Sequence, residues 1–214
     1  MKKYLVEFIG TFFLVFTIGM TVLDPGAGPL APIAIGAALM IMVYAGGHIS
    51  GGHYNPAVTL GVWLRGRCST ADVIPYWIVQ LLGATAAAFL ALHLKAIPGI
   101  PAGAIPPPSP HGAINALIAE FVGTFALVYV VLNVATAKAT AGNSYYGLAI
   151  GFTVTTMAFA LGSVSGGAFN PAVATGITIM HLAKSSDLWI YFVSDLAAGA
   201  AAALTFKFIN PEDK

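Results

Sequence analysis

Asn55 and Asn170 stand in two nearly identical phrases, SGGHYNPAV and SGGAFNPAV, and both are followed by Pro-Ala. Asparagine is a strong helix N-cap, and proline is favoured at the first helical position because its missing N–H would be unpaired there. The preceding glycines permit tight turns and close backbone approach. One such phrase predicts only a capped helix after a turn. Two copies predict two helix N-termini with amide donors and loop carbonyl acceptors, a chemistry suited to hydrogen-bonding small neutral molecules.

The composition is that of a membrane protein. Of 214 residues, 58% are hydrophobic and only 8% are charged, whereas soluble domains carry roughly 25% charged residues. The mean hydropathy is +0.86. The net charge of +1 provides no basic surface for nucleic acid, which excludes that class of partner. The single cysteine, Cys68, excludes an intrachain disulfide and a multi-cysteine metal site. Because no carboxylate pair, nucleophile–base set or cofactor loop is present, we expect neither an enzyme nor a bound metal or cofactor.

Six stretches are apolar and long enough to cross a bilayer as helices, which takes about 20 residues. They are Tyr4–Val22, Ala31–Gly47, Val73–Leu94, Ala113–Thr136, Tyr145–Leu161 and Leu188–Phe208. Two shorter apolar segments, Pro56–Leu64 and Pro171–Ala183, follow the repeated phrases. These are too short to cross and fit re-entrant half helices. The sequence therefore predicts an all-α membrane protein with six transmembrane helices and two re-entrant half helices.

The two halves of the chain repeat each other. A shift of 115 residues places Asn55 on Asn170, and VEFIGTFFLVF in the first span recurs as AEFVGTFALVY in the fourth. A Pro- and Gly-rich linker, residues 95–112, separates a first repeat (1–94) from a second repeat (113–214). Each repeat holds three spans, an odd number, so the second repeat must have inverted topology. The N-termini of the two half helices then meet near the bilayer midplane.

The distribution of lysine and arginine predicts the orientation of the chain. With the N-terminus inside, the inner segments carry most of the positive side chains, namely Lys2, Lys3, Arg65, Arg67, Lys138, Lys207 and Lys214. The outer segments carry Lys95 and Lys184. Because positively charged loops remain on the cytoplasmic side, we expect both termini in the cytoplasm and the protein in the inner membrane of the cell.

The meeting of the two half helices predicts a pore. Irregular backbone at mid-membrane depth is tolerated only where it packs in protein or lines a watery cavity. The unwound segments supply carbonyl acceptors or loop support through Gly51, Gly52, Ser165 and Gly166. Asn55 and Asn170 add amide donors where the half helices meet. Acceptors along a wall with donors at the centre suit a file of small neutral molecules, and the positive helix ends repel cations and protons.

These phrases resemble the aquaporin, or major intrinsic protein, family. The resemblance rests on the E-F-x-G-T-F copies, on Y-W-x-x-Q-x-x-G-A in the third span and on the paired SGG-x-x-NPA phrases with Asn55, Pro56, Ala57, Asn170, Pro171 and Ala172. HISGGHYNPAVT is close to the form that bacterial members use, and the resemblance covers almost the whole chain. It implies the aquaporin-like fold, one pore per subunit for water and small neutral solutes, and a homotetramer in the lipid bilayer.

The chain departs from this family at the narrow selectivity filter. Most members follow the second Asn-Pro-Ala with an arginine that lines the filter, and Val173 stands there in this sequence. By spacing from the two asparagines, the other filter positions fall on Ile35, Ala158 and Gly167. Arginine brings five N–H donors and a permanent charge, so its replacement widens the constriction. Ammonia, urea, small polyols, undissociated metalloid acids and dissolved gas become candidate permeants beside water.

Three carboxylates lie inside predicted spans, where a charge costs roughly 2.5–3.5 kcal/mol on insertion scales and marks function or a buried partner. We expect Glu7 and Glu120 to accept hydrogen bonds from loop backbone. Asp195 falls on Gln80 under the repeat shift, where the family usually has Gly-Pro nearby. It either accepts loop hydrogen bonds in the same way or positions a loop now that the filter arginine is absent.

His48 and His53 flank the first glycine pair. Their spacing, with no carboxylate or thiol nearby in the sequence, is poor for a metal site. We expect both to hydrogen-bond loop carbonyls, or His48 to line the inner pore.

Other functions fit parts of the pattern. Inverted repeats with broken helices also build secondary transporters, although the sequence has no sodium-site signature and no proton relay beyond Asp195. An apolar ring can also exclude water, which would give a poorly water-permeable pore for gas, ammonia or metalloid acids. A closed pore would leave a structural membrane protein, with solute flux no greater than in empty liposomes.

Overall fold

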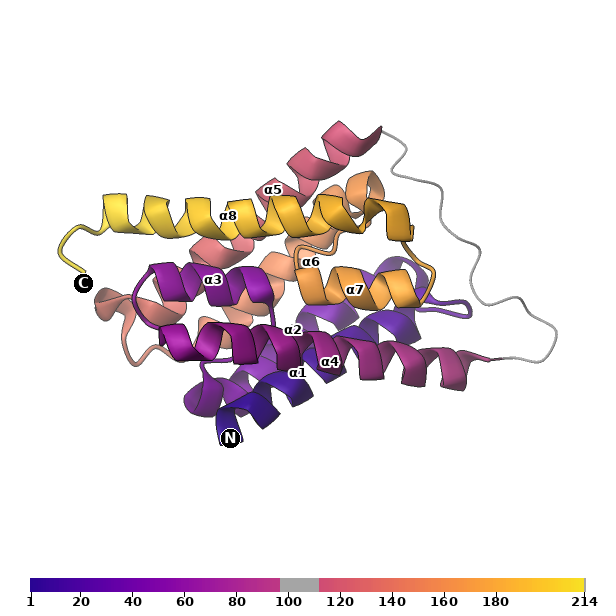
Figure 1. The fold of residues 1–214 in the computed structure, drawn as a ribbon, viewed down its shortest axis with the longest axis horizontal. Helices are drawn as coiled ribbons and strands as arrows, with labels where there is room; N and C mark the ends of the chain where they lie inside the picture. The colour runs from indigo at the N-terminus through magenta and orange to yellow at the C-terminus, as the bar shows by residue number, and fades with distance from the viewer. Residues whose placement is uncertain (97–111, 214) are drawn as a thin grey trace.

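The computed structural model describes residues 1–96 and 112–213, and this part of the chain is mostly helical (Figure 1). Within these residues, six long helices have the length and composition to cross a membrane: α1 (Lys2–Val22), α2 (Ala31–Ser50), α4 (Thr70–Lys95), α5 (Gly112–Val131), α6 (Tyr146–Ser165) and α8 (Leu188–Ile209). Two half-length helices are α3 (Pro56–Leu64) and α7 (Pro171–Ile179). Short 3₁₀ turns span Gly28–Leu30, Lys138–Thr140 and Ser185–Asp187, and a π-helical turn, Leu132–Thr136, extends α5. The predicted architecture of six spans and two half helices is confirmed.

Two spans end several residues later than the sequence predicts. Helices α2 and α6 continue to Ser50 and Ser165, the serines of the repeated phrases. Each ends at a glycine in the left-handed region, Gly51 with φ 91° and Gly166 with φ 94°. A glycine at this position ends helices readily because it carries no Cβ. The predicted ends were too early because apolar periodicity weakens before the helical hydrogen bonds stop.

The second half helix is shorter than predicted, whereas the first has the predicted bounds. Helix α7 ends at Ile179 rather than at Ala183. The chain reverses at His181, whose φ is 58°, and the N–H of Leu182 bonds back to the carbonyl of Ile177 at 2.8 Å. The apolar residues beyond Ile179 therefore belong to a turn that the hydrophobic pattern does not distinguish from helix.

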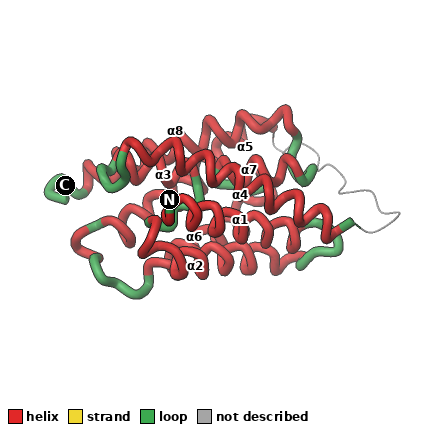
Figure 2. Tube along the Cα trace, turned by 60° about the horizontal axis from the view of Figure 1, so that its bottom comes forward, coloured by secondary structure: helices red, strands yellow, loops and turns green. Residues whose placement is uncertain are grey.

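The helices pack in two corresponding sets. Helix α1 packs along α4 as α5 packs along α8, and α2 packs against α6 between the sets. Each half helix also contacts a long helix of the opposite half, α3 on α8 and α7 on α4. The half helices lie end to end between α8 and α4 in Figure 1, and Figure 2 shows the long helices running side by side with the loops at two ends of the bundle. The two half helices are thus enclosed by long helices from both halves of the chain.

Glycines permit close contacts between helices. A Cβ added at Gly36 on α2 would lie 2.5 Å from the carbonyl oxygen of Gly151 on α6. A Cβ added at Gly151 would lie 2.4 Å from the carbonyl oxygen of Gly36. A Cβ at Gly199 on α8 would lie 2.5 Å from the carbonyl oxygen of Ala57 on α3. Small residues allow backbones in membrane proteins to approach in this way, and here they let α8 support the start of a half helix.

An ionic cluster around Asp213 holds the C-terminal tail against the helices. The side chain of Arg65, which follows α3, is 2% exposed, and its Nη2 lies 2.6 Å from Oδ1 of Asp213. The guanidinium also lies over the ring of Phe206, 4.6 Å from its centroid. Asp213 Oδ2 accepts a hydrogen bond from the backbone N–H of Lys138 at 2.8 Å. The tail thereby joins the end of α3 to the loop between α5 and α6.

Asp213→Asn is expected to lower thermal stability at neutral pH but not in acid. The backbone N–H of Lys138, aided by the Arg65 guanidinium, holds the pKa of Asp213 below its usual range. The ionised carboxylate therefore adds stability above the pKa of an unfolded aspartate, about 3.9, and this contribution is lost as the pH falls through the lower folded value. Thermal unfolding in detergent at about pH 7 and about pH 3 tests this. The exposed Glu212→Gln is the control, and equal midpoints of Asp213→Asn and wild type at neutral pH would contradict the prediction.

Candidate functional site

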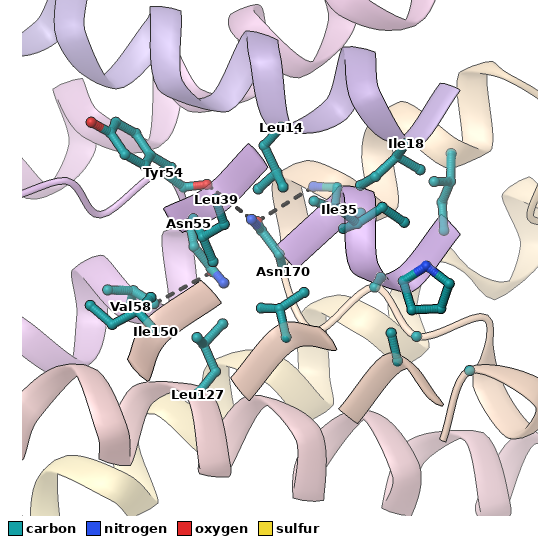
Figure 3. Close-up of a pocket in the computed structure, with 18 of the residues that line it drawn as sticks. Leu14, Ile18, Ile35, Leu39, Tyr54, Asn55, Val58, Leu127, Ile150 and Asn170 are labelled. Carbon is teal, nitrogen blue, oxygen red and sulfur yellow. Dashed lines mark hydrogen bonds between the residues drawn. The ribbon is translucent and has the colours of Figure 1, made fainter. Parts of the chain in front are cut away.

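The two asparagines cap their own half helices and bind the opposite loop (Figure 3). In each, Oδ1 accepts the backbone N–H of the second residue of the helix at 2.8 Å. Asn55 Nδ2 donates to the carbonyl of Phe169 at 2.9 Å, and Asn170 Nδ2 donates to the carbonyl of Tyr54 at 2.9 Å. An asparagine amide carries two N–H bonds, so each has a second N–H beside the one that crosses to the other half.

The residues before the asparagines turn the chain sharply. Tyr54 and Phe169 have φ values of 50° and 49°, which non-glycine residues rarely adopt. Their buried rings pack against Gly10 and Gly123, where an added Cβ would lie 2.1 and 2.2 Å from the ring atoms. Sequence reasoning missed this role of the two glycines. The available signal was a glycine three residues after glutamate in both E-F-x-G-T-F copies.

Two buried glutamates hold the loops before the half helices. The carboxylate of Glu7 accepts hydrogen bonds at 2.7, 2.9 and 2.6 Å from the Ser50 hydroxyl, the His53 N–H and the Tyr54 N–H. The carboxylate of Glu120 accepts hydrogen bonds at 2.5, 3.0 and 2.6 Å from the Ser165 hydroxyl, the Ala168 N–H and the Phe169 N–H. Both glutamates are fully buried. Each carboxylate therefore fixes the irregular backbone that leads to an asparagine.

Gln80 belongs to the first of these supports and was missed as a site residue. Its Nε2 donates to Glu7 at 2.8 Å and lies 3.0 Å from the hydroxyl of Thr59. Gln80 is fully buried on α4. The Y-W-x-x-Q phrase of the third span contained the residue, but nothing in the sequence indicated its partner.

Asp195 has a different environment from the two glutamates. It is fully buried, and Oδ1 accepts a hydrogen bond from the Thr124 hydroxyl at 2.9 Å. The backbone N–H of Asn170 also interacts with this carboxyl. Oδ2 has no partner within residues 1–96 and 112–213. Asp195 therefore shares a loop-backbone contact with the glutamates, at the Asn170 N–H, but its other donor is a hydroxyl on α5.

A cavity of about 390 Å³ lies beside the two asparagines. Its lining includes Asn55 and Asn170 together with Gly52, Gly166 and the four positions expected for the filter, Ile35, Ala158, Gly167 and Val173. Much of the remaining wall is aliphatic, as Figure 3 shows for Leu14, Ile18, Leu39, Leu127 and Ile150. None of the described lining residues is Lys, Arg, Asp or Glu. Such a lumen can hydrogen-bond a neutral molecule at the asparagines and offers no counter-charge to an ion.

A second cavity of about 720 Å³ adjoins the first, because His53 and Val131 line both. His48 and Gly51 lie in its wall, with Arg67 among several polar residues. Ser165, in contrast, lines neither cavity, and its hydroxyl donates a hydrogen bond to Glu120. The two cavities thus share part of their wall, and the second reaches the residues around Arg67.

His53 does not hydrogen-bond a loop carbonyl as expected. Its Nδ1 lies 3.1 Å from the hydroxyl of Thr59, one turn into α3. The start of α3 at Pro56 brings this hydroxyl within hydrogen-bonding distance of the imidazole nitrogen. Within the described residues, no three His, Cys, Asp or Glu side chains gather where they could hold a metal ion.

Known proteins share both the sequence and the fold. The family model for major intrinsic protein matches residues 1–206. The chain is 32% identical over 242 residues to Aquaporin AqpM of Methanothermobacter thermautotrophicus, covering 99% of this chain and 98% of that protein. It is 35% identical over 218 residues to glycerol uptake facilitator protein-like 6 of Lactiplantibacillus plantarum, covering 100% of both. The X-ray structure of the aquaglyceroporin from Plasmodium falciparum matches with a TM-score of 0.83 at 21% identity, covering 98% of this chain and 97% of that one.

These matches run end to end rather than over one motif. The fold is also that of the aquaglyceroporin structure over nearly its whole length. Because the family model covers residues 1–206 and the relatives align along their full length, this chain belongs to the major intrinsic protein family.

Proposed function

We propose that the chain is a passive channel with a wide, apolar filter, which passes small neutral solutes in addition to water. Family membership makes it a multi-pass membrane channel for water or small solutes. One observation carries the finer proposal. Val173 lines the lumen together with Ile35, Ala158 and Gly167, and no charged side chain lies among them.

The chemistry of these four residues favours neutral solutes of larger size than water. Valine is shorter than arginine and offers no donor, so loop carbonyls, the two asparagine amides and His53 are the polar groups that a solute meets. Urea and small polyols can exchange their water for these groups and keep aliphatic contact with the walls. Ions lose their hydration without compensation in such a lumen, and the positive ends of α3 and α7 repel cations.

Val173→Arg is expected to make the channel more restrictive to the larger solutes. A guanidinium at this position adds bulk and charge to the constriction, so urea and glycerol flux should fall by about tenfold, equivalent to about 1.4 kcal/mol of barrier, and water flux should fall less. Stopped-flow light scattering on proteoliposomes measures water, glycerol, urea and ammonia flux. Val173→Leu is the matched control, because it adds bulk without charge or donors.

The same assay distinguishes the competing functions. Urea flux through Val173→Arg equal to or above that of wild type would overturn the wide filter. Wild-type water flux no greater than in empty liposomes would instead favour a pore that excludes water, a candidate supported by the aliphatic walls around Leu39 and Ile150. Accumulation of a solute against its gradient would indicate a transporter.

We also propose the membrane arrangement that the sequence predicts. Both termini face the cytoplasm of the inner membrane, repeats 1–94 and 113–214 form the two inverted halves, and four subunits assemble as a homotetramer. Arg67 and Lys138 support this orientation because both line the second cavity, which would be the inner vestibule. Most of the linker assigned to residues 95–112 lies outside the described residues.

A further inference from the structure

The hydrogen-bond networks around Glu7 and Glu120, which hold the two pore loops, differ at one buried position. In the first half, the Gln80 amide gives the Glu7 carboxylate its fourth hydrogen bond, at 2.8 Å. In the second half, the repeat position of Gln80 holds Asp195 on α8, which packs along the helix that carries Glu120. Other members correspond in pairs, Ser50 with Ser165, Tyr54 with Phe169 and Tyr76 with Tyr191. An acid thus replaces an amide in an otherwise repeated network.

Asp195 and Glu120 share one buried site. Glu120 and Thr124 are one helical turn apart and lie on the same face of α5. Thr124 holds Asp195 Oδ1 at 2.9 Å, so the Asp195 carboxyl lies next to that face. Both acids have 0% exposure. Asp195 Oδ2 has no partner among the residues that the structure describes, although it is the atom with which a carboxylic acid could donate.

No positive side chain faces this pair in the described chain. Helix α5 contributes Glu120 itself, and α8 contributes Tyr191, with Asp187 in the turn that precedes it. Helices α3 and α7, which also pack on α8, contain no titratable residue within their bounds. Arg65, at the distant end of α3, is paired with Asp213. Because two ionised carboxylates repel in a buried site without a counter-charge, such a pair retains one proton.

The hydrogen-bond donors decide where this proton lies. Glu120 accepts two backbone N–H groups and one hydroxyl, which together stabilise its ionised form. Asp195 accepts one hydroxyl and a weaker interaction from Asn170. We propose that Asp195 is a positioning residue held as a neutral carboxylic acid. It supplies the hydrogen-bond network around Glu120 with the donor that the Gln80 amide supplies to the network around Glu7.

The proposed acid acts on the pore through the loop that it supports. Glu120 binds the backbone N–H groups of Ala168 and Phe169. These two residues lie directly between Gly167 and Asn170, which line the lumen. A neutral partner leaves Glu120 free to hold that loop, whereas a second negative charge would repel it. This inference goes beyond the proposed filter and concerns protonation, so it can be tested even if the permeant solute differs from the one proposed.

Asp195→Asn is the isosteric variant that mimics the neutral acid, and Asp195→Ala removes the donor. Asp195→Asn is expected to keep the wild-type thermal midpoint and the wild-type ratio of urea to water flux in proteoliposomes. Asp195→Ala should lower the midpoint by several degrees, because a buried hydrogen-bonded group is lost. A midpoint for Asp195→Asn as low as that of Asp195→Ala would overturn the proposal, since it would mean that the negative charge is required.

Infrared difference spectroscopy tests the proton directly. At neutral pH, wild type minus Asp195→Asn is expected to show the C=O stretch of a protonated carboxylic acid, and wild type minus the exposed Asp24→Asn should not. A protonated band that persists in Asp195→Asn, or bands of ionised carboxylate alone, would overturn the assignment. Failure of the wide-filter proposal would appear in the solute fluxes of wild type and leave this spectrum unchanged, so the two failures are distinguishable.

Discussion

Glu7→Ala is expected to yield little or no folded protein. The Glu7 carboxylate receives four hydrogen bonds of 2.6–2.9 Å, from Ser50, His53, Tyr54 and Gln80, in a fully buried site. Each buried donor left without a partner costs about 1–3 kcal/mol. Four such losses approach the whole stability of a typical protein, about 5–15 kcal/mol. Size-exclusion chromatography after detergent extraction should show a loss of the monodisperse peak at unchanged synthesis.

The exposed Glu212→Ala provides the matched control, because it removes the same side chain where it has no buried role. Glu7→Gln should lie between the two, since one acceptor oxygen remains but an NH₂ group faces former donors. A monodisperse Glu7→Ala protein with the wild-type midpoint would show that the loop before Asn55 does not need this acceptor.

Gly199→Ala is expected to destabilise the protein and reduce solute flux. The added Cβ would meet the oxygen, carbon and Cα of Ala57 at 2.5, 3.2 and 3.5 Å, all of them backbone atoms that cannot rotate away. Overpacking of this kind costs about 1–3 kcal/mol, and each kcal/mol corresponds to about 2–4 °C in a chain of this size. Because Ala57 lies two residues after Asn55, displacement of α3 also shifts the amide in the lumen.

The control for the effect on stability is Gly162→Ala, in which the new Cβ meets no atom within 4 Å and points toward the open cavity that Gly162 lines. Alanine also favours the helical state over glycine by about 1 kcal/mol, so Gly162→Ala should be neutral or stabilising. If Gly199→Ala had the same midpoint as Gly162→Ala, the contact between α8 and the start of α3 would not be tight in the protein.

Local chemistry made the central part of the site predictable. Asn-Pro after a glycine pair predicts a capped helix from the properties of three residue types, and α3 and α7 both begin at the predicted proline. The repeat then predicts how the two N-termini meet, because a copied odd number of spans has only the inverted arrangement. Each of these inferences needed residues close together in the sequence or an exact internal copy.

The remaining contacts had no such signal. Arg65 pairs with Asp213 across 148 positions, and Gln80 reaches Glu7 across 73. Neither pairing has a counterpart in the other repeat that could have indicated it. The lumen wall was equally hidden, because in a helix that is apolar on every side nothing distinguishes Leu39, which lines the cavity, from Ile41, which is 52% exposed.

The crossed asparagine bonds make the centre of the pore an isologous interface. Asn55 binds the carbonyl of Phe169 and Asn170 binds that of Tyr54, so each half gives the other the bond that it receives. This reciprocity is the mark of a two-fold dimer. Neither half satisfies its own turn carbonyl, because its asparagine donates across the interface. A single half would need a second copy of the same turn to complete these bonds, and one chain holds both copies.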